Sequence, residues 1–330
     1  QHSAACNGHA ADVGVCGGGK KDLGHRVQLF SMDSLHHSNG QADILIIDEV
    51  HEAAADKASY SLSKYDRSRN YGLSATHNMR LDNKNLRVEA MCGPIIHCVP
   101  YQEAQANGLV VPIVVLWSDV IMDSDLCAEI EDPVTRKRVG VWRNNVRNIA
   151  IAHDARRYGP DDQVLITCET TEHVMALKKL LPEYEAVYRE NSISDSDIAY
   201  YRAQGIWPEN MSPMTTERRA MLTDFFSKGR LKKAIVTTVW NVGVSFNDLA
   251  VLIRADAGGS ATNDTQIPGR VSRVAKDKEF AVVHDFKDQF NKGFKQRATG
   301  RRTNYERQGW TQMNTVQYFN EKQSSLFGGV

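Results

Sequence analysis

The chain has 330 residues, of which 42% are hydrophobic, and its 40 Lys and Arg balance its 40 Asp and Glu. This length predicts about two domains, and the balanced charge means that any nucleic-acid surface has to be a local one. No apolar run approaches the roughly 18 residues of a membrane span, and the polar N-terminal stretch is unlike a signal peptide. The six cysteines form no C-x-x-C pair, which disfavours a zinc or disulfide framework and fits a reducing cytoplasm.

Residues 14–21 nearly spell the phosphate-binding loop G-x-x-x-x-G-K-[ST], but Lys21 stands where a hydroxyl residue would bind Mg²⁺. No strongly apolar strand leads into this segment and no convincing helix follows it. We therefore interpret residues 17–21 as a glycine-rich turn before a strand at residues 27–30. No other G-K-[ST] occurs in the sequence.

Four branched aliphatic residues at 44–47 run without alternation, which predicts a strand buried on both faces of a parallel sheet. Asp48, Glu49 and His51 follow at its carboxyl end, where ligands bind in open α/β sheets. An Asp at this place can hold Mg²⁺ beside nucleotide phosphates, and a Glu can orient or deprotonate the attacking water. The alternative is a solvated acidic turn.

Further polar motifs follow predicted strands. A strand at residues 71–73 leads to Ser74 and Thr76, and the strand at 164–167 leads to a helix that starts near Thr170. The other motif residues follow strands at 234–236 and 251–253: Thr237, Thr238, Gly243, Gln266, Arg270 and Arg273. Two arginines three apart at the start of a helix would project on one face and can fork onto phosphate oxygens.

These motifs resemble those of superfamily 2 helicases and translocases. The segment from Asp48 to His51 resembles the DExH box, residues 74–76 resemble the third motif, and residues 266–273 match the sixth, Q-x-x-G-R-x-x-R. The resemblance covers roughly residues 27–285 and is nearest in character to the XPB-like and phage-type DNA helicases. It implies ATP and Mg²⁺ as cofactors, with Asp48 on the metal.

The resemblance also implies roles for the remaining motif residues. Ser74 and Thr76 would hydrogen-bond the DExH carboxylates, Gly243 would lie near the nucleotide, and Gln266 and the two arginines would contact its phosphates. Contacts to the nucleic-acid backbone are implied for Ser31, Ser34, Thr170, Thr237 and Thr238. For Ser31 and Thr170, capping of the helix that follows is a simpler alternative.

The segment from residue 292 to residue 307 holds six Lys and Arg against one Glu, and Arg301 and Arg302 lie in its second half. Such a basic run can lie along a phosphate backbone. An exposed basic helix end explains the composition equally well.

The sequence thus predicts an α/β protein with two RecA-like domains of the P-loop NTPase helicase core, each with a mostly parallel sheet. We expect a partial first domain at residues 1–117, a linker or inserted hairpin at 118–140, a second domain at 141–290 and a basic tail at 291–330. ATP would bind between the two domains. The opening strand and phosphate loop of the first domain would come from a preceding segment or a partner chain.

The expected activity is ATP-dependent movement along nucleic acid, with DNA preferred and RNA second, in the cytoplasm or, for a phage gene, the host cytoplasm. Another possibility is a nucleic-acid-binding fragment or subunit without ATPase activity of its own.

Overall fold

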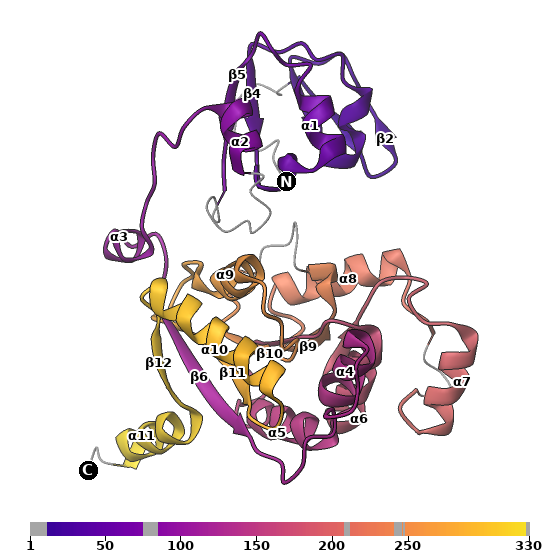
Figure 1. Cartoon of the computed structure of the whole chain (residues 1–330), viewed down its shortest axis with the longest axis vertical. Coiled ribbons are helices and arrows are strands. Elements are labelled where there is room, and N and C mark those ends of the chain that lie inside the picture. The colour runs from indigo at the N-terminus through magenta and orange to yellow at the C-terminus, as the bar shows by residue number, and fades with distance from the viewer. Residues whose placement is uncertain (1–11, 75–84, 208–211, 241–245, 247, 328–330) are drawn as a thin grey trace. The chain divides into compact units, whose positions relative to one another are not determined.

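The computed structural model describes residues 12–74, 85–207, 212–240, 246 and 248–327. The chain divides into two compact units, Gln1–Cys98 and Val99–Val330, which are described one at a time (Figure 1). No helix within the described residues is long and apolar enough to cross a membrane.

Unit 1 contains two small sheets. The first has the order β2-β1-β3 and the second pairs β4 with β5 in parallel. Its strands are β1 (Val13–Gly17), β2 (Lys20–Lys21), β3 (Val27–Phe30), β4 (Ile44–Ile47) and β5 (Arg69–Gly72). Its helices are η2 (Met32–His37), η3 (Glu52–Ala54), α1 (Asp56–Leu62) and α2 (Asn85–Cys92). A small core around Leu35, Ile47 and Leu62 holds them together.

The predicted burial of β4 on both faces is wrong for this unit. Ile47 is 5% exposed, but Ile44 and Ile46 are 58% and 65% exposed. Because successive side chains point to opposite faces of a strand, Leu45 and Ile47 face the core while Ile44 and Ile46 face away from it. Within the described residues, helices cover one face of the β4–β5 pair only.

Unit 2 is built on a sheet of seven parallel strands in the order β12-β6-β11-β10-β7-β9-β8. The strands are β6 (Ile113–Val120), β7 (Val164–Thr167), β8 (Glu185–Val187), β9 (Lys233–Val236), β10 (Val251–Arg254), β11 (Ala281–Asp288) and β12 (Thr311–Asn314). All residues of β7 and β10 are buried, as expected for central parallel strands. The predicted α/β class with a mostly parallel sheet is confirmed.

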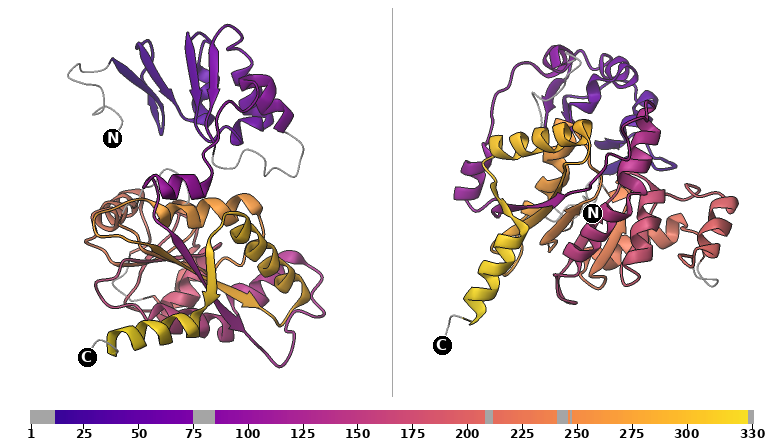
Figure 2. Two further views of the ribbon diagram at one scale, coloured as in Figure 1. Left: turned by 90° about the vertical axis from the view of Figure 1, so that its left-hand side faces the viewer. Right: turned by 60° about the horizontal axis from the view of Figure 1, so that its bottom comes forward.

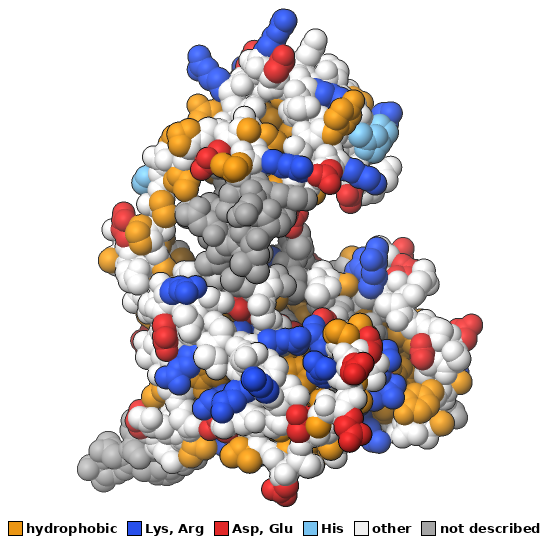
Figure 3. Space-filling model, viewed as in Figure 1, with side chains coloured by type: hydrophobic (Ala, Val, Ile, Leu, Met, Phe, Trp, Pro, Cys, Tyr) orange, Lys and Arg blue, Asp and Glu red, His pale blue; other side chains and the backbone are white. Residues whose placement is uncertain are grey.

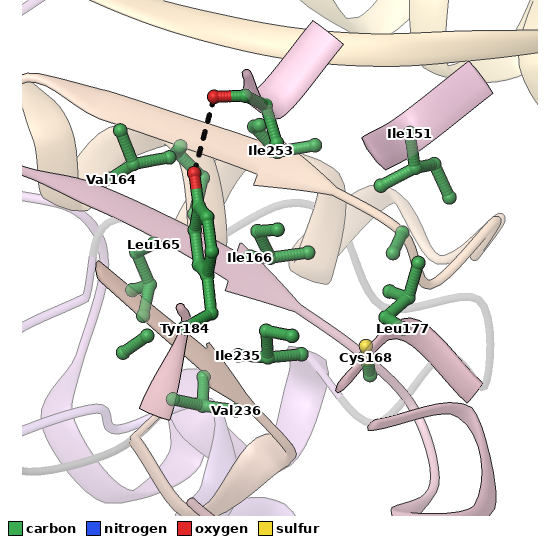
Figure 4. Packing of buried hydrophobic residues seen from close by; sticks show 14 of the residues in the cluster. Ile151, Val164, Leu165, Ile166, Cys168, Leu177, Tyr184, Ile235, Val236 and Ile253 are labelled. Carbon is green, nitrogen blue, oxygen red and sulfur yellow. Dashed lines mark hydrogen bonds between the residues drawn. The ribbon is translucent and has the colours of Figure 1, made fainter. Parts of the chain in front are cut away.

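Helices cover both faces of this sheet. The helices are α3 (Tyr101–Ala106), α4 (Pro133–Lys137), the π-helix η4 (Arg138–Trp142), α5 (Asn145–Ala155), α6 (Thr171–Leu180), α7 (Asp195–Ala203), α8 (Thr216–Ser227), η5 (Thr238–Trp240), α9 (Ala261–Gly269), η6 (Arg270–Ser272), α10 (Lys292–Arg307) and α11 (Thr315–Phe327). Helices α5 and α11 lie on the face opposite to α9 (Figure 2). The core includes Ile166, Ile235 and Ile253, and Tyr184 donates a hydrogen bond to the Ala155 carbonyl oxygen at 3.2 Å (Figure 4).

Two of the predicted domain boundaries need correction. Strand β6 was expected to close the first domain at residue 117, but it pairs with β11 and β12 inside the second unit. The expected linker at 118–140 also lies within unit 2, where α4 and η4 bring Lys137 and Arg138 to Glu169 and Glu172. A charge-rich segment looks like a linker in sequence, but here two of its basic side chains pair with carboxylates at the start of α6.

The expected basic tail at 291–330 is part of the domain. Helix α10 packs against β11 and α9, and β12 forms the edge of the large sheet beside β6. Phe294, Ala298 and Tyr305 are buried along α10, so this helix has an apolar side that the basic composition hides.

Two histidines are fully buried in unit 2. His284 on β11 is hydrogen-bonded to the Tyr158 hydroxyl at 2.5 Å, and His173 on α6 contacts the Asn148 side chain at 3.0 Å. Burial lowers the pKa of His284 to about 4 and that of His173 to about 3. Both imidazoles are therefore neutral in the folded protein at neutral pH.

We expect unit 2 to lose stability as pH falls below about 6.5. The unfolded chain takes up protons on these histidines from pH 6.5 downward, whereas the folded chain does so only near pH 4 and pH 3. The free energy of unfolding should fall by about 2 kcal/mol per histidine at pH 5. Urea titrations between pH 8 and pH 5 measure this. Replacing the exposed His153 by Gln should preserve the pH dependence, and a flat profile would contradict neutral burial.

Candidate functional site

The glycine-rich segment forms a β-hairpin. Strand β1 pairs with β2 in an antiparallel manner, with Gly17 opposite Lys20. The two turn residues Gly18 and Gly19 both have positive φ, +59° and +83°, as a two-residue hairpin turn of the primed type requires. Strand β3 follows at residue 27, so the predicted glycine-rich turn before a strand is confirmed. Lys20 and Lys21 are exposed.

The acidic motif lies at the carboxyl end of β4. Ile47 pairs with Gly72, and the backbone bonds continue past both strands, from Leu73 N to Ile47 O and from Val50 N to Leu73 O. A Cβ at Gly72 would lie 2.9 Å from a Val50 methyl carbon. The absence of a side chain at Gly72 therefore lets the segment after β5 run close beside the segment after β4.

This close approach joins two of the predicted motifs. Ser74 Oγ lies 3.0 Å from His51 Nδ1, and the same nitrogen lies 3.3 Å from Glu49 Oε2. His51 is only 11% exposed, whereas Glu49 is 41% exposed. The geometry thus brings Glu49, His51 and Ser74 together, with the carboxylate open to solvent.

Glu49 has a left-handed backbone with φ of 48°. For a residue with a side chain this conformation costs roughly 1–2 kcal/mol. The amide of Glu49 donates to Asp48 Oδ1 at 3.0 Å, which helps to hold the turn. Residues in this region of φ are concentrated at functional sites, and the conformation turns Glu49 away from the direction of the strand.

The residues of unit 1 fit an Mg²⁺ ion that is held mainly by a nucleotide. Asp48 is exposed, and hard carboxylate oxygens suit Mg²⁺, which keeps several waters and phosphate ligands. No cluster of three or more His, Cys, Asp or Glu that could hold a metal occurs within the described part of the chain. A metal site here would accordingly depend on phosphate oxygens together with Asp48.

Several predicted residues of unit 2 follow strands that end at the same sheet edge. Thr170 caps α6 by accepting a hydrogen bond from His173 N at 3.3 Å, so the capping alternative describes its side chain. Thr237 is buried, and its amide donates to Val187 O at 3.1 Å. Thr238 is exposed at the start of η5. Because β7 and β9 are parallel neighbours, these threonines share one edge of the sheet.

Gln266 lies in the last turn of a helix and Arg270 and Arg273 follow that helix, whereas the two arginines were expected at the start of one. Helix α9 ends at Gly269, η6 covers Arg270–Ser272, and Arg273 has an extended backbone that forms a β-bridge with Val110. Pro268 and Gly269 explain the break, since both disfavour a continuing helix. Gln266 and Arg270 are four apart, so they lie on one side, whereas Arg273 does not continue their helical row.

Four further predicted positions remain. Thr76 and Gly243 lie outside the described residues. Ser31 precedes η2, but its side chain makes no capping bond and instead donates to Ser34 Oγ at 2.9 Å. Both serines therefore stay candidates for contacts with a ligand.

The structure corrects the expectation for Arg301. Its side chain is 1% exposed and donates to both oxygens of Asp285, at 2.9 and 3.1 Å. It also donates to the carbonyl oxygens of Gly258 and Phe286. Arg301 is thus an internal residue that is closed to nucleic acid. Arg302 is 59% exposed and pairs with Glu306.

Sequence reasoning missed the buried network to which Arg301 belongs. Its other members are Arg254, Asp256, Asp264, Asp285 and Tyr305. Burial opposes ionisation of Asp256, but the charge and hydrogen bonds of Arg254 lower the pKa of this carboxyl to about 2. Two features of the sequence could have indicated this network. Arg254 ends an otherwise apolar strand, and Asp285 lies inside another.

Comparison with known proteins agrees with this architecture. Residues 147–275 match the helicase conserved C-terminal domain. The matched region lies within unit 2. It is 24% identical over 247 residues to the protein named "Putative helicase 22" of Sulfolobus islandicus filamentous virus, a match that covers 74% of this chain but only 42% of that relative.

Solved structures share the fold. Dbp5 of S. cerevisiae, bound to RNA and ADP BeF3, has a TM-score of 0.59 at 11% identity, over 96% of this chain and 73% of that one. The helicase Lhr of Mycobacterium smegmatis, bound to ssDNA and AMP-PNP, has a TM-score of 0.54 at 16% identity, over 92% of this chain and 38% of that one. The expected RecA-like α/β fold is confirmed.

Adjacent arginines of α10 should respond differently to truncation. Arg301→Ala leaves Asp285 buried without its main partner, so we expect a loss of about 3–5 kcal/mol. Arg302→Ala removes an exposed pair and should change stability by less than about 0.5 kcal/mol. Urea unfolding midpoints at pH 7 measure both, and equal effects would contradict the assigned burial.

Proposed function

We propose that this chain is a large part of an ATP-dependent nucleic-acid translocase or helicase of superfamily 2, with DNA as the preferred track. Within it, Asp48 would hold the nucleotide's Mg²⁺ and Glu49 would activate the attacking water. The observation that carries the proposal is the contact of His51 with Ser74, which links the DExH segment to the third motif. On the basis of the sequence motifs, we also propose that the chain belongs to the XPB-like or phage-type branch of these helicases.

The chemistry assigned to unit 1 follows from the exposure of its carboxylates. Mg²⁺ when bound neutralises charge on the phosphates, and a half-exposed Glu49 can accept a proton from water. His51 lies within contact distance of both Glu49 and Ser74. It is therefore placed to hold the orientation of the carboxylate and to connect it with the segment after β5.

In unit 2 we propose that Gln266 and Arg270 contact phosphate oxygens. Both side chains are partly exposed, and a guanidinium can form two parallel hydrogen bonds to a phosphate. Arg273 stays a candidate with a different approach direction, because it follows the 3-10 turn. Lys278 donates to the Arg273 carbonyl oxygen at 2.9 Å and so holds this end of the motif.

The proposed nucleic-acid surface includes the outer face of α10. Lys292, Lys295 and Arg302 are exposed and fall at spacings of three and seven, which places them on one side of the helix. Figure 3 shows Lys and Arg side chains gathered over this part of unit 2. Such a row can neutralise successive phosphates without reading sequence. The relatives that bind RNA or single-stranded DNA support this assignment by analogy only.

Removing two charges from this row should weaken the salt dependence of DNA binding. For Lys295→Ala/Arg302→Ala, we expect the log–log slope of affinity against salt for single-stranded DNA to fall by about one to two. Fluorescence anisotropy at several salt concentrations measures the slope, with RNA of the same sequence as a parallel arm.

The control removes two exposed lysines elsewhere in unit 2, Lys179→Ala/Lys228→Ala, and should keep the original slope. An unchanged slope in the α10 variant would remove this helix from the surface. Absence of binding to both DNA and RNA at low salt would overturn the proposed function.

A second candidate function is nucleic-acid binding without ATPase activity by this chain alone. The glycine-rich segment supports it, because a hairpin with Lys20 and Lys21 on an exposed strand offers no helix N-terminus to phosphates. Asp48 and Glu49 would repel ATP where no lysine and amide nest balance them.

We therefore expect the 330-residue chain to bind Mg²⁺–ATP with a Kd above about 1 mM. This Kd corresponds to a binding free energy weaker than roughly 4 kcal/mol. Isothermal titration calorimetry measures this affinity directly. A micromolar Kd would show that the hairpin or another segment of this chain forms a working phosphate site, and would favour the motor over the second candidate.

A further inference from the structure

Two buried arginines belong to one hydrogen-bonded network beside helix α9, which carries Gln266. Arg254 ends β10 and Arg301 lies in the middle of α10, and each side chain is 1% exposed. Arg254 donates to Asp256 at 2.7 and 3.1 Å. Tyr305 connects the two arginines, since its hydroxyl accepts from Arg254 Nη1 at 2.8 Å and donates to Asp285 Oδ2 at 2.7 Å.

The network reaches directly into α9 through Asp264. One oxygen of Asp264 accepts from Arg254 Nη1 at 3.0 Å, and the other accepts from Asn304 Nδ2 of α10 at 3.0 Å. Asp264 is itself 1% exposed. It lies two residues before Gln266 on the same short helix, and Arg270 begins η6 directly after that helix, so the contacts of Asp264 hold the element that carries Gln266 and leads into Arg270.

The connection from β10 to α9 is held by the same groups. Arg301 Nη1 donates to Gly258 O at 2.6 Å, and Gly258 N donates to Asp256 Oδ2 at 3.2 Å. Between them, Ala257 has a left-handed backbone with φ of 48° and is buried. A non-glycine residue keeps this conformation only where its surroundings enforce it.

Stability alone does not explain this arrangement. Burying several charges costs free energy of folding, and apolar side chains of similar volume often give equal or greater stability. Here nearly every donor of the two arginines goes to α9, to the loop before it, or to the carboxylate that holds α10. The hydrogen bonds therefore connect α9 and the loop before it with α10, as expected of residues that position one helix against another.

We infer that Arg254, Asp264 and Arg301 are positioning residues that fix helix α9 against α10 and thereby set the orientation of Gln266 and Arg270. The functional consequence depends on the proposed function of those two residues. The positional part does not, because it can be measured without nucleotide or nucleic acid.

The test is backbone hydrogen exchange of the whole chain, followed by mass spectrometry. Asp264→Ala should speed exchange at the amides of α9 by about tenfold or more, while α6 on the other face of the sheet changes little. Asp264→Asn keeps an acceptor oxygen for Arg254 and should restore most of the protection. Leu177→Ala, a buried change in α6, is the matched control and should loosen α6 but not α9.

Equal loss of protection in α9 and α6 on Asp264→Ala would show a merely structural residue and overturn the inference, as would unchanged protection in α9. Should Asp264→Ala fail to fold, Asn304→Ala decides, because it removes one hydrogen bond from α10 to Asp264 and must then speed exchange in α9 but not in α6. The DNA titrations above test the proposed function separately, so failure of one leaves the other measurable.

Discussion

The parallel pairing of seven strands is the constraint on which unit 2 depends. Because the strands run in one direction, the residues that follow β7, β9 and β10 all lie at the carboxyl ends of the strands, on one side of the sheet. The chain then returns through helices to the amino ends of the strands, and α9 makes this return between β10 and β11. Thr170 and Thr237 therefore lie where strands end, while Arg273 pairs with Val110, just before β6 begins. The sheet separates the two groups of motif residues even though all belong to one domain.

Much of this organisation could be predicted from the sequence, because strands such as residues 164–167 and 251–253 are continuous apolar runs. The hairpin at residues 17–21 was also predictable, since two adjacent glycines favour a primed turn. Residues 44–47 show the limit of such patterns. Four aliphatic residues look the same whether one face or both are covered, and the covering depends on elements far away in the chain.

The errors in the candidate site have a similar cause. Arg301 and Arg302 are neighbours in a basic segment, and composition cannot tell which of them points inward. That choice depends on Asp285 and Gly258, which lie on other elements. Asp264 and Arg254 were missed for the same reason, since each looks unremarkable in sequence and gains its meaning only from a partner on another element.

Helix α10 combines the two uses of positive charge in this protein. Its inner side carries Arg301, whose hydrogen bonds go to acceptors inside the protein and whose side chain is only 1% exposed. Its outer side carries Lys292, Lys295 and Arg302, which are exposed to solvent and can therefore reach phosphates. A rigid inner side gives the outer row a fixed geometry against the sheet. The same helix contacts α9 through Asn304 and Asp264, so whatever binds outside it binds to the element that supports Gln266 and Arg270.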